Sequence, residues 1–309
     1  MVKFAIYIKL KELNLNPVII AVTRHKDIYF IKKYLDFIEI KKTFKELKEK
    51  DFDFLMVNSD QTWIDYTPPY LLDYGFLRFA ENWKIPKFVY GTSYPKNYWK
   101  YPKKITKMAR RLARKFNGVS VREFPTIKLA KKYLNVQSEL VLDPTLLIDK
   151  QYYLNLIKDY KGNFDPRIDY LCVYQLDKNN RINKFIKYAS LKLKLKVYNI
   201  NIKKRNYIEE FLKCIYISKG VITDSYHGTI FSYIFEKPFV SFINPKRGIT
   251  RFETIRSILQ INDRILSSKL ISNDKIYLLN ENITYNMTTI NKMKVKSLTF
   301  LKKNLLLSK

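Results

Sequence analysis

The side chain best suited to acid–base chemistry stands in a polar turn of the second half of the chain. His227 lies in the string Asp-Ser-Tyr-His-Gly at residues 224–228, directly after the apolar run 220–223. Histidine exchanges protons near neutral pH more readily than other side chains, so it suits a general acid or base. Amides at the start of a following helix could also hold an anionic group. We take His227 as the first candidate for a proton donor, with a capping or core histidine as the alternative.

Three further side chains with proton-accepting or hydrogen-bonding oxygens accompany His227 in this hypothesis. Asp224 and Ser225 precede it by three and two positions and could orient it or bind hydroxyl groups of a substrate, whereas helix N-capping is the alternative. Asp60 follows the apolar run 54–57 and could accept a proton from an attacking hydroxyl, whereas a turn-forming cap is its alternative.

Two arginines are the candidates for binding an anionic substrate. Arg122 follows the apolar run 118–121, and Arg251 follows a basic loop at residues 244–248. The planar guanidinium donates hydrogen bonds in pairs to carboxylate and phosphate groups. The alternatives are an ion pair with Glu123 or another neighbour for Arg122, and a solvated run of charge for Arg251. Ser93, which ends another strand-like segment, is a further substrate-binding candidate.

Short apolar strands alternate with helical segments along the whole chain, which is typical of a parallel α/β sheet. The candidates above stand where these strands end, and in open α/β sheets that edge binds ligands. Residues 32–50 are interpreted as basic helix and loop. The strands are predicted at 18–22, 54–57, 87–90, 118–121, 139–142, 170–174, 196–200, 220–223 and 239–242, and the main helices at 3–13, 103–116, 183–193, 207–218, 226–235 and 286–308. Residues 151–168 are interpreted as a helix followed by a polar linker.

Length and composition limit the classes of protein that this chain can belong to. Its 309 residues suffice for two medium-sized domains. The 7 glycines exclude an architecture built on glycine-rich nucleotide loops, and the 2 histidines exclude a histidine-rich metal site. Both cysteines stand in apolar strings without partners at metal-ligand spacing, which favours a reducing compartment. We expect a cytoplasmic protein, because no apolar run reaches the roughly 18 residues of a membrane span.

The formal net charge of +30 has two interpretations. A Lys-, Ile-, Asn- and Tyr-rich composition is typical of a compositional bias that leaves a solvated basic surface. Alternatively, the charge binds an anionic partner, such as the anionic inner face of a membrane or a lipid-linked substrate. Specific nucleic-acid binding is not expected, because no recognition motif is present.

Six strings, in this order along the chain, resemble those of the polysaccharide pyruvyl transferase family. They are Asn-Ser-Asp-Gln-Thr-Trp at 58–63, Tyr-Gly-Thr-Ser at 90–93, Ser-Val-Arg-Glu at 120–123, Val-Leu-Asp-Pro-Thr-Leu at 141–146, the segment 222–242 around His227, and Arg-Phe-Glu at 251–253. The resemblance implies two Rossmann-like domains that face each other across a cleft, as in the two-domain glycosyltransferases. We place the first domain at 1–160, the second at 161–285 and a C-terminal helix at 286–309.

The same resemblance implies a reaction. Members of the family transfer pyruvate from phosphoenolpyruvate onto two hydroxyls of a sugar, forming a cyclic ketal, during assembly of bacterial cell-surface polysaccharides. The motifs imply no metal and no organic cofactor. Many members have arginine at the position of Ser225, so in this chain another cation, Arg122 or Arg251, must bind the anionic donor.

The sequence departs from the family pattern at its beginning. Members usually open with a strand and a small-residue loop, whereas residues 3–18 resemble the helix that follows them. We therefore expect the first strand to be absent, and activity to depend on a form extended ahead of Met1. Two other functions remain open: a nucleotide-sugar glycosyltransferase, and an inactive module that binds anions or glycans.

Overall fold

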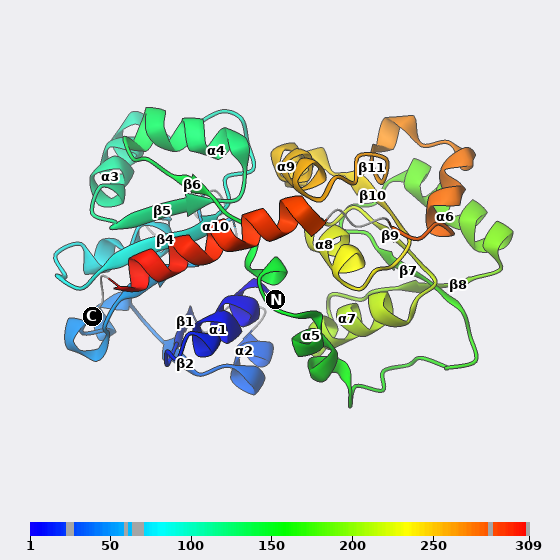
Figure 1. Cartoon of the computed structure of the whole chain (residues 1–309), viewed down its shortest axis with the longest axis horizontal. Coiled ribbons are helices and arrows are strands. Elements are labelled where there is room, and N and C mark those ends of the chain that lie inside the picture. Colours follow the sequence, from blue (N-terminus) through cyan, green and yellow to red (C-terminus); the bar gives the residue numbers. More distant parts are fainter. Residues whose placement is uncertain (23–27, 59–60, 64–70, 284–286, 307–309) are drawn as a thin grey trace. The chain divides into compact units, whose positions relative to one another are not determined.

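The computed structural model describes residues 1–22, 28–58, 61–63, 71–283 and 287–306. By their internal contacts these residues form two compact units (Figure 1). The first, called unit 1 below, contains residues 1–147 and 287–309, and unit 2 contains residues 148–286. Both are mixed α/β structures whose strand pairs are all parallel among the described residues, so the predicted fold class is confirmed.

The strands of unit 1 form two separate parallel sheets. The order β1-β2 makes up the smaller sheet and β3-β4-β5-β6 the larger one. The strands are β1 (Ile19–Val22), β2 (Phe37–Ile40), β3 (Leu55–Val57), β4 (Lys87–Thr92), β5 (Gly118–Val121) and β6 (Glu139–Leu140). Apolar side chains of β3 to β5 are buried against neighbouring helices, as in a parallel sheet covered on both faces.

The helices of unit 1 include one from the far end of the sequence. The bounds are α1 (Val2–Glu12), α2 (Ile28–Tyr34), α3 (Lys103–Ala113), α4 (Phe124–Leu129) and α10 (Met287–Leu306). Helix α10 lies against the larger sheet, where the backbone N–H of Leu142 donates to Ser297 Oγ at 2.9 Å. The Phe300 ring centroid lies 6.2 Å from that of Tyr90 on β4. Residues 287–306 are therefore part of the core of unit 1.

Unit 2 has one continuous five-stranded parallel sheet in the order β11-β10-β9-β7-β8. Its strands are β7 (Tyr170–Tyr174), β8 (Lys196–Asn199), β9 (Gly220–Thr223), β10 (Phe239–Ile243) and β11 (Ile265–Ser267), and its helices are α5 (Lys150–Ile157), α6 (Asn180–Leu193), α7 (Tyr207–Ile217), α8 (Tyr226–Ile234) and α9 (Ile249–Leu259). The three central strands are almost wholly buried, which explains why each reads as a continuous apolar run.

Several elements differ from the prediction. The segment 32–50 was expected as helix and loop, but it contains β2, a strand parallel to β1. Only the last of its four residues is buried, and the lysine pairs at 32–33 and 41–42 give the surrounding segment the look of a basic helix. Helices α4 and α9 and strand β11 were not predicted. Within the part of the chain that the structure describes, no helix is both long and apolar enough to cross a membrane.

Candidate functional site

A tight contact between strand β9 and helix α8 positions His227. A Cβ atom added to Gly228 would lie 2.2 Å from Thr223 Oγ1, far inside contact distance, so only glycine allows the helix to approach the strand end so closely. The Thr223 hydroxyl in turn donates to the Tyr174 carbonyl on β7 at 2.7 Å. The His-Gly pair in the sequence thus has a structural reason, and His227 occupies the first turn of the helix.

Ser225 is the N-cap of helix α8. Its Oγ accepts a hydrogen bond from the Gly228 N–H at 3.3 Å, and its own N–H donates to Thr223 Oγ1 at 3.0 Å. Within unit 2, Ser225 therefore makes the contacts of a helix N-cap, which was the alternative raised for it from the sequence. The side chain is 5% exposed, in contrast to the half-buried imidazole of His227.

Arg251 is brought to the same end of the sheet by helix α9. Its guanidinium carbon lies 5.2 Å from the centroid of the Tyr226 ring, and the His227 ring centroid lies 5.3 Å from the same centroid. One guanidinium nitrogen of Arg251 also donates to the Arg247 carbonyl. The Tyr226 ring thus contacts both the predicted proton donor and one of the predicted cations.

Asp224 is held by donors from two neighbouring strand ends. Its carboxylate accepts hydrogen bonds from the N–H groups of Leu176 and Asp177, at 2.6 and 3.1 Å, and from Asn244 Nδ2 at 2.9 Å. The residue is 3% exposed, and burial raises the pKa of the carboxyl above its ordinary value. Asp224 therefore ties the segments after β7, β9 and β10 together.

An ion pair between Asp177 and Arg247 completes this cluster. Arg247 Nε donates to Asp177 Oδ2 at 3.0 Å, and Asn244 Nδ2 donates to the same oxygen at 2.7 Å. The hydrogen bond from Arg247 lowers the pKa of Asp177 from its ordinary value. Sequence reasoning missed Asp177, although an acidic residue three positions after an apolar strand was an available signal. We call Asp177, Asp224, His227, Arg247 and Arg251 the unit 2 cluster.

The predicted residues of unit 1 form a different arrangement at the ends of β4 and β5. Ser93 Oγ donates to Glu123 Oε1 at 2.5 Å, while the Tyr94 N–H and the Thr126 hydroxyl donate to Oε2 at 3.1 and 3.2 Å. Ser93 and Glu123 are both 0% exposed. Glu123 is thus an internal acceptor that fixes the loop after β4.

Arg122 is buried in an ion pair with Asp143. Its Nη1 donates to Asp143 Oδ2, and the two side chains are 1% and 0% exposed. The other carboxylate oxygen of Asp143 accepts from the Thr145 N–H at 3.0 Å and the Thr145 hydroxyl at 2.6 Å. The ion pair considered as an alternative for Arg122 is therefore present, with Asp143 rather than Glu123 as the partner. We call Ser93, Arg122, Glu123 and Asp143 the unit 1 cluster.

Asp60, the predicted proton acceptor, lies outside the described residues. Its neighbour Trp63 is 0% exposed, with the indole N–H donating to the Gly75 carbonyl at 3.0 Å and the ring stacked on Phe76 at 5.2 Å. Trp63 is accordingly a core residue. No group of three or more metal-ligating side chains gathers within the described ranges.

The unit 2 cluster combines the functional groups that an anionic substrate needs. Two arginines supply positive charge, and the half-buried imidazole of His227, in the first turn of α8, lies against the same Tyr226 ring as the Arg251 guanidinium. The Asp224 carboxylate, held by Leu176, Asp177 and Asn244, connects the loops that carry these side chains. Such a set can bind a phosphate or carboxylate and move a proton next to it.

Comparison with known proteins gives results at two levels. A crystal structure of a protein of uncharacterised function from Klebsiella pneumoniae is 14% identical, with a TM-score of 0.49 over 86% of this chain and 98% of that chain. A comparison with curated proteins found no match. The family model described as polysaccharide pyruvyl transferase matches residues 4–246, which include β1 to β10 and the His227 motif. The chain therefore belongs to the polysaccharide pyruvyl transferase family.

Proposed function

We propose that this chain transfers pyruvate from phosphoenolpyruvate onto two hydroxyls of one sugar residue, forming a cyclic ketal in bacterial surface polysaccharide. Membership of the family supports a transferase that acts on a polysaccharide or its precursor. The observation that carries the finer proposal is the juxtaposition of His227 and Arg251 around the Tyr226 ring. A proton donor beside a fixed cation matches a substrate that carries both an anionic group and a protonatable carbon.

In the proposed reaction two sugar hydroxyls add to the same carbon of phosphoenolpyruvate, and its phosphate leaves. His227 gives a proton to the methylene carbon of phosphoenolpyruvate while a sugar hydroxyl adds to the neighbouring carbon and loses its own proton. Phosphate then leaves that carbon as its C–O bond breaks. The second hydroxyl adds in its place, loses its proton and closes the ring. The products are the ketal and inorganic phosphate, and no atom changes its oxidation state through an external oxidant or reductant. The scheme as we propose it involves no metal and no organic cofactor.

Each step assigns a role to residues of this chain. Arg251 and the neighbouring Arg247 bind the phosphate or carboxylate of the donor, because guanidinium groups pair with both. Asp224 and Ser225 hold the loop and helix start that carry His227, and Asp60 is our proposed acceptor for the hydroxyl proton. Arg122 and Ser93 remain candidates for substrate binding, although Arg122 pairs with Asp143 and Ser93 with Glu123 in the structure.

The experiment that tests this function measures phosphate release from phosphoenolpyruvate. The full chain is incubated with the donor and a panel of glycosides, some with two hydroxyls placed to close a ring and some with one of them blocked. We expect release only with unblocked acceptors, and a new ketal carbon in the product by NMR. His227→Gln should lower the rate by about 100-fold or more, as expected for loss of a general acid.

Matched variants make the result specific. His25→Gln changes the other histidine of the chain, and Arg256→Gln changes another arginine of helix α9. Both should keep the rate, whereas Arg251→Gln should raise the concentration of phosphoenolpyruvate needed for half-saturation. If His227→Gln keeps full activity while folded, the proposed mechanism is wrong. Stabilisation by a nucleotide sugar and not by phosphoenolpyruvate would instead favour a glycosyltransferase.

We further propose that the chain works in the cytoplasm, at the inner face of the membrane. Helix α3 supports this, because its sequence Lys-Lys-Ile-Thr-Lys-Met-Ala-Arg-Arg-Leu-Ala collects five basic residues and no acidic one. Such a face attracts anionic lipid through screened electrostatic interactions that high salt weakens. Co-sedimentation with anionic vesicles that is lost at high salt would support the placement, and equal binding to neutral vesicles would contradict it.

A further inference from the structure

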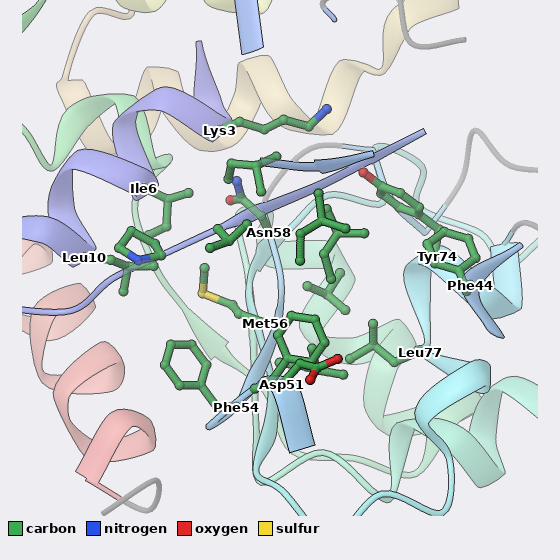
Figure 2. A pocket seen from close by; sticks show the side chains of 18 of the residues that line it. Lys3, Ile6, Leu10, Phe44, Asp51, Phe54, Met56, Asn58, Tyr74 and Leu77 are labelled. Atoms are coloured by element: carbon green, nitrogen blue, oxygen red, sulfur yellow. The ribbon is translucent and has the colours of Figure 1, made fainter. Parts of the chain in front are cut away.

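A cavity in unit 1 and a pair of thiols in unit 2 both lie outside the two clusters described above. The cavity has a volume of about 280 Å³ and is lined mainly by apolar side chains, among them Ile6, Leu10, Phe44 and Leu77 (Figure 2). No cysteine or histidine is among the described residues that line it. The two thiols, by contrast, are nucleophilic groups that the proposed reaction leaves unused.

Cys172 and Cys214 meet inside unit 2, although they are 42 positions apart in the sequence. Cys172 lies on the inner strand β7 and Cys214 on helix α7. Both are free thiols and fully buried. The Cys214 thiol donates a hydrogen bond to Cys172 Sγ, and the two sulfur atoms are 2.7 Å apart. Because the chain has 2 cysteines, this contact involves both of them.

The separation of the two sulfur atoms is intermediate between ordinary contact and a covalent bond. Unbonded carbon atoms make contact at about 3.5–4.0 Å, and sulfur is larger than carbon. The sulfur–sulfur bond of a disulfide is about 2.05 Å long, so a bridge would bring these two atoms closer by roughly 0.7 Å. Rotation of the two side chains with slight backbone adjustment can supply a movement of this size.

A second contact holds the same parts of β7 and α7 together. Residues 172 and 174 lie on the same face of the sheet, because side chains alternate along a strand. Tyr174 and Phe211, which stands three residues before Cys214, have ring centroids 4.9 Å apart. Strand β7 is also paired on both sides, with β8 and with β9. The strand pairing and the ring contact therefore keep the two sulfur atoms close to each other.

The surroundings make the two thiols chemically unequal. Burial raises the pKa of the Cys214 thiol, and the hydrogen bond to Cys172 and the nearby Glu210 carboxylate raise it further. Glu210 lies one turn before Cys214 on α7, and its side chain is paired with Lys204 at 2.7 Å. Since Cys214 is the donor of the hydrogen bond, a thiolate on Cys172 would keep that bond. Cys172 is thus the better placed of the two to attack an oxidant.

We propose that Cys172 and Cys214 are a redox-active pair, which forms a disulfide within the folded chain when a small peroxide enters unit 2. The Cys172 thiolate attacks one peroxide oxygen, the O–O bond breaks, and the departing hydroxide takes up a proton to become water. The Cys214 sulfur then attacks the resulting sulfenic acid on Cys172 and loses its proton. The S–O bond breaks, and a second water leaves. Two thiols and one peroxide thus become one disulfide and two waters, with sulfur oxidised and peroxide oxygen reduced.

The bridge would link two elements that support the unit 2 cluster. Strand β7 continues into Leu176 and Asp177, whose N–H groups donate to the Asp224 carboxylate. A bond between β7 and α7 also closes a loop that contains α6 and β8, which restricts the unfolded chain and stabilises the folded one. The proposal does not depend on the reaction proposed above, because its test measures thiols and unfolding and not pyruvate transfer.

The experiment treats the reduced full chain with hydrogen peroxide and counts the remaining thiols. Iodoacetamide, added afterwards in urea, labels every thiol that is still free, and mass spectrometry measures the labels. We expect the folded chain to lose both labels and to give one linked pair of peptides that contains Cys172 and Cys214. Dithiothreitol should restore both labels. The thermal midpoint of the oxidised chain should rise by about 5 °C or more, and circular dichroism checks that it remains folded.

Single variants separate the two sulfur atoms. In Cys214→Ala the sulfenic acid on Cys172 has no partner, so dimedone should trap it. Cys172→Ala should give about 10-fold less dimedone adduct, because the remaining thiol ionises less readily. Neither variant should gain thermal stability from peroxide, which controls for oxidation of methionine.

Four outcomes would overturn the proposal. Two labels retained by the folded chain, while the chain unfolded in urea loses them, would show that the native packing does not allow the bridge. A bridge between two chains would show that the internal contact is not the reactive one. A lower thermal midpoint of the bridged chain would show that the bridge distorts unit 2. More dimedone adduct in Cys172→Ala than in Cys214→Ala would reverse the order of attack.

Discussion

The ion pairs of the two clusters of charged residues differ in how far they are exposed to solvent. In the unit 1 cluster, the side chains of Arg122 and Asp143 are 1% and 0% exposed. In the unit 2 cluster, those of Arg247 and Asp177 are 47% and 33% exposed. A buried pair fixes loop geometry at the cost of desolvating both ions, whereas a half-exposed pair can exchange its partner for an incoming anion. Arginine–aspartate pairs near strand ends thus hold loops in place in unit 1, whereas in unit 2 such a pair leaves its charges accessible to solvent.

The largest effect is expected on removing one partner of the buried pair. Arg122→Met leaves the Asp143 carboxylate buried without its cation, and should cost about 3–5 kcal/mol in the free energy of unfolding. Urea denaturation measures this loss. The double variant with Asp143→Leu should recover part of it, because no uncompensated charge remains. If Arg122→Met were as stable as the parent chain, the buried ion pair would not stabilise unit 1 as we infer.

A smaller loss of stability should follow from crowding beneath the unit 2 cluster. Gly228→Ala places a methyl group 2.2 Å from Thr223 Oγ1, so helix α8 must shift, at about 1–3 kcal/mol. Gly220→Ala, at the start of strand β9, is the control, since the nearest neighbour of its added methyl group is the flexible Leu279 side chain at 3.3 Å. Thermal unfolding should separate the two variants. Equal midpoints would mean that the helix start is less tightly fixed than its contacts indicate.

The exposed pair should matter little for stability but measurably for ionisation. Arg247→Gln removes the main cause of the lowered pKa of Asp177, so this pKa should return towards its ordinary value. The change in the free energy of unfolding should stay below about 1 kcal/mol, as for other exposed ion pairs. Carboxyl-carbon NMR titration follows the pKa. Lys246→Gln removes only a weaker electrostatic contribution to the same lowered pKa and should shift it less than Arg247→Gln does. If Arg247→Gln lowered the free energy of unfolding as much as Arg122→Met, the two ion pairs would not differ in their contribution to stability.

The smallest effect is a difference in pH dependence between neighbouring carboxyls. Asp177, whose pKa is lowered, contributes stability that is present above its unfolded-state pKa and is lost as the pH falls through the lower folded-state value. The pKa of Asp224 is raised by burial, so its effect on stability depends on pH in the opposite direction. Its contribution to the free energy of unfolding is present below its unfolded-state pKa and is lost as the pH rises through the higher folded-state value. NMR titration should place the midpoint of Asp224 above that of Asp177. The reverse order would contradict this assignment.

Much of the framework could be predicted from short apolar runs. Strands β7, β9 and β10 are buried on both faces, so their sequences contain unbroken apolar residues. Strand β2 escaped prediction because only its last residue is buried, and flanking lysines resemble a basic helix. The division of the unit 1 strands into two sheets has no signal in any single segment, since pairing depends on residues far apart in the chain.

The sequence predicted where the candidate residues lie along the chain, but not which residues they contact. The sequence places Arg122 and Arg251 after strands, yet the partner of Arg122 is 21 residues away and cannot be read from spacing. The connection between His227 and Arg251 runs through the Tyr226 ring, which only the packing of α8 against α9 reveals. Helix N-capping by Ser225 was raised from the sequence as the alternative to a substrate contact, and the capping hydrogen bond is present in the structure.

The return of helix α10 to unit 1 has a consequence for biosynthesis. Ser297 accepts its hydrogen bond from an amide 155 residues earlier, and Asn304 packs against Gly118 so closely that a Cβ there would meet its Oδ1 at 2.2 Å. Unit 2 consists of one uninterrupted stretch, residues 148–286, and can fold as it leaves the ribosome. Residues 1–147 lack the packing of residues 287–306 until these have been synthesised. We therefore expect unit 1 to complete its folding after unit 2, and chaperones that bind exposed apolar surface to engage residues 1–147 during that interval.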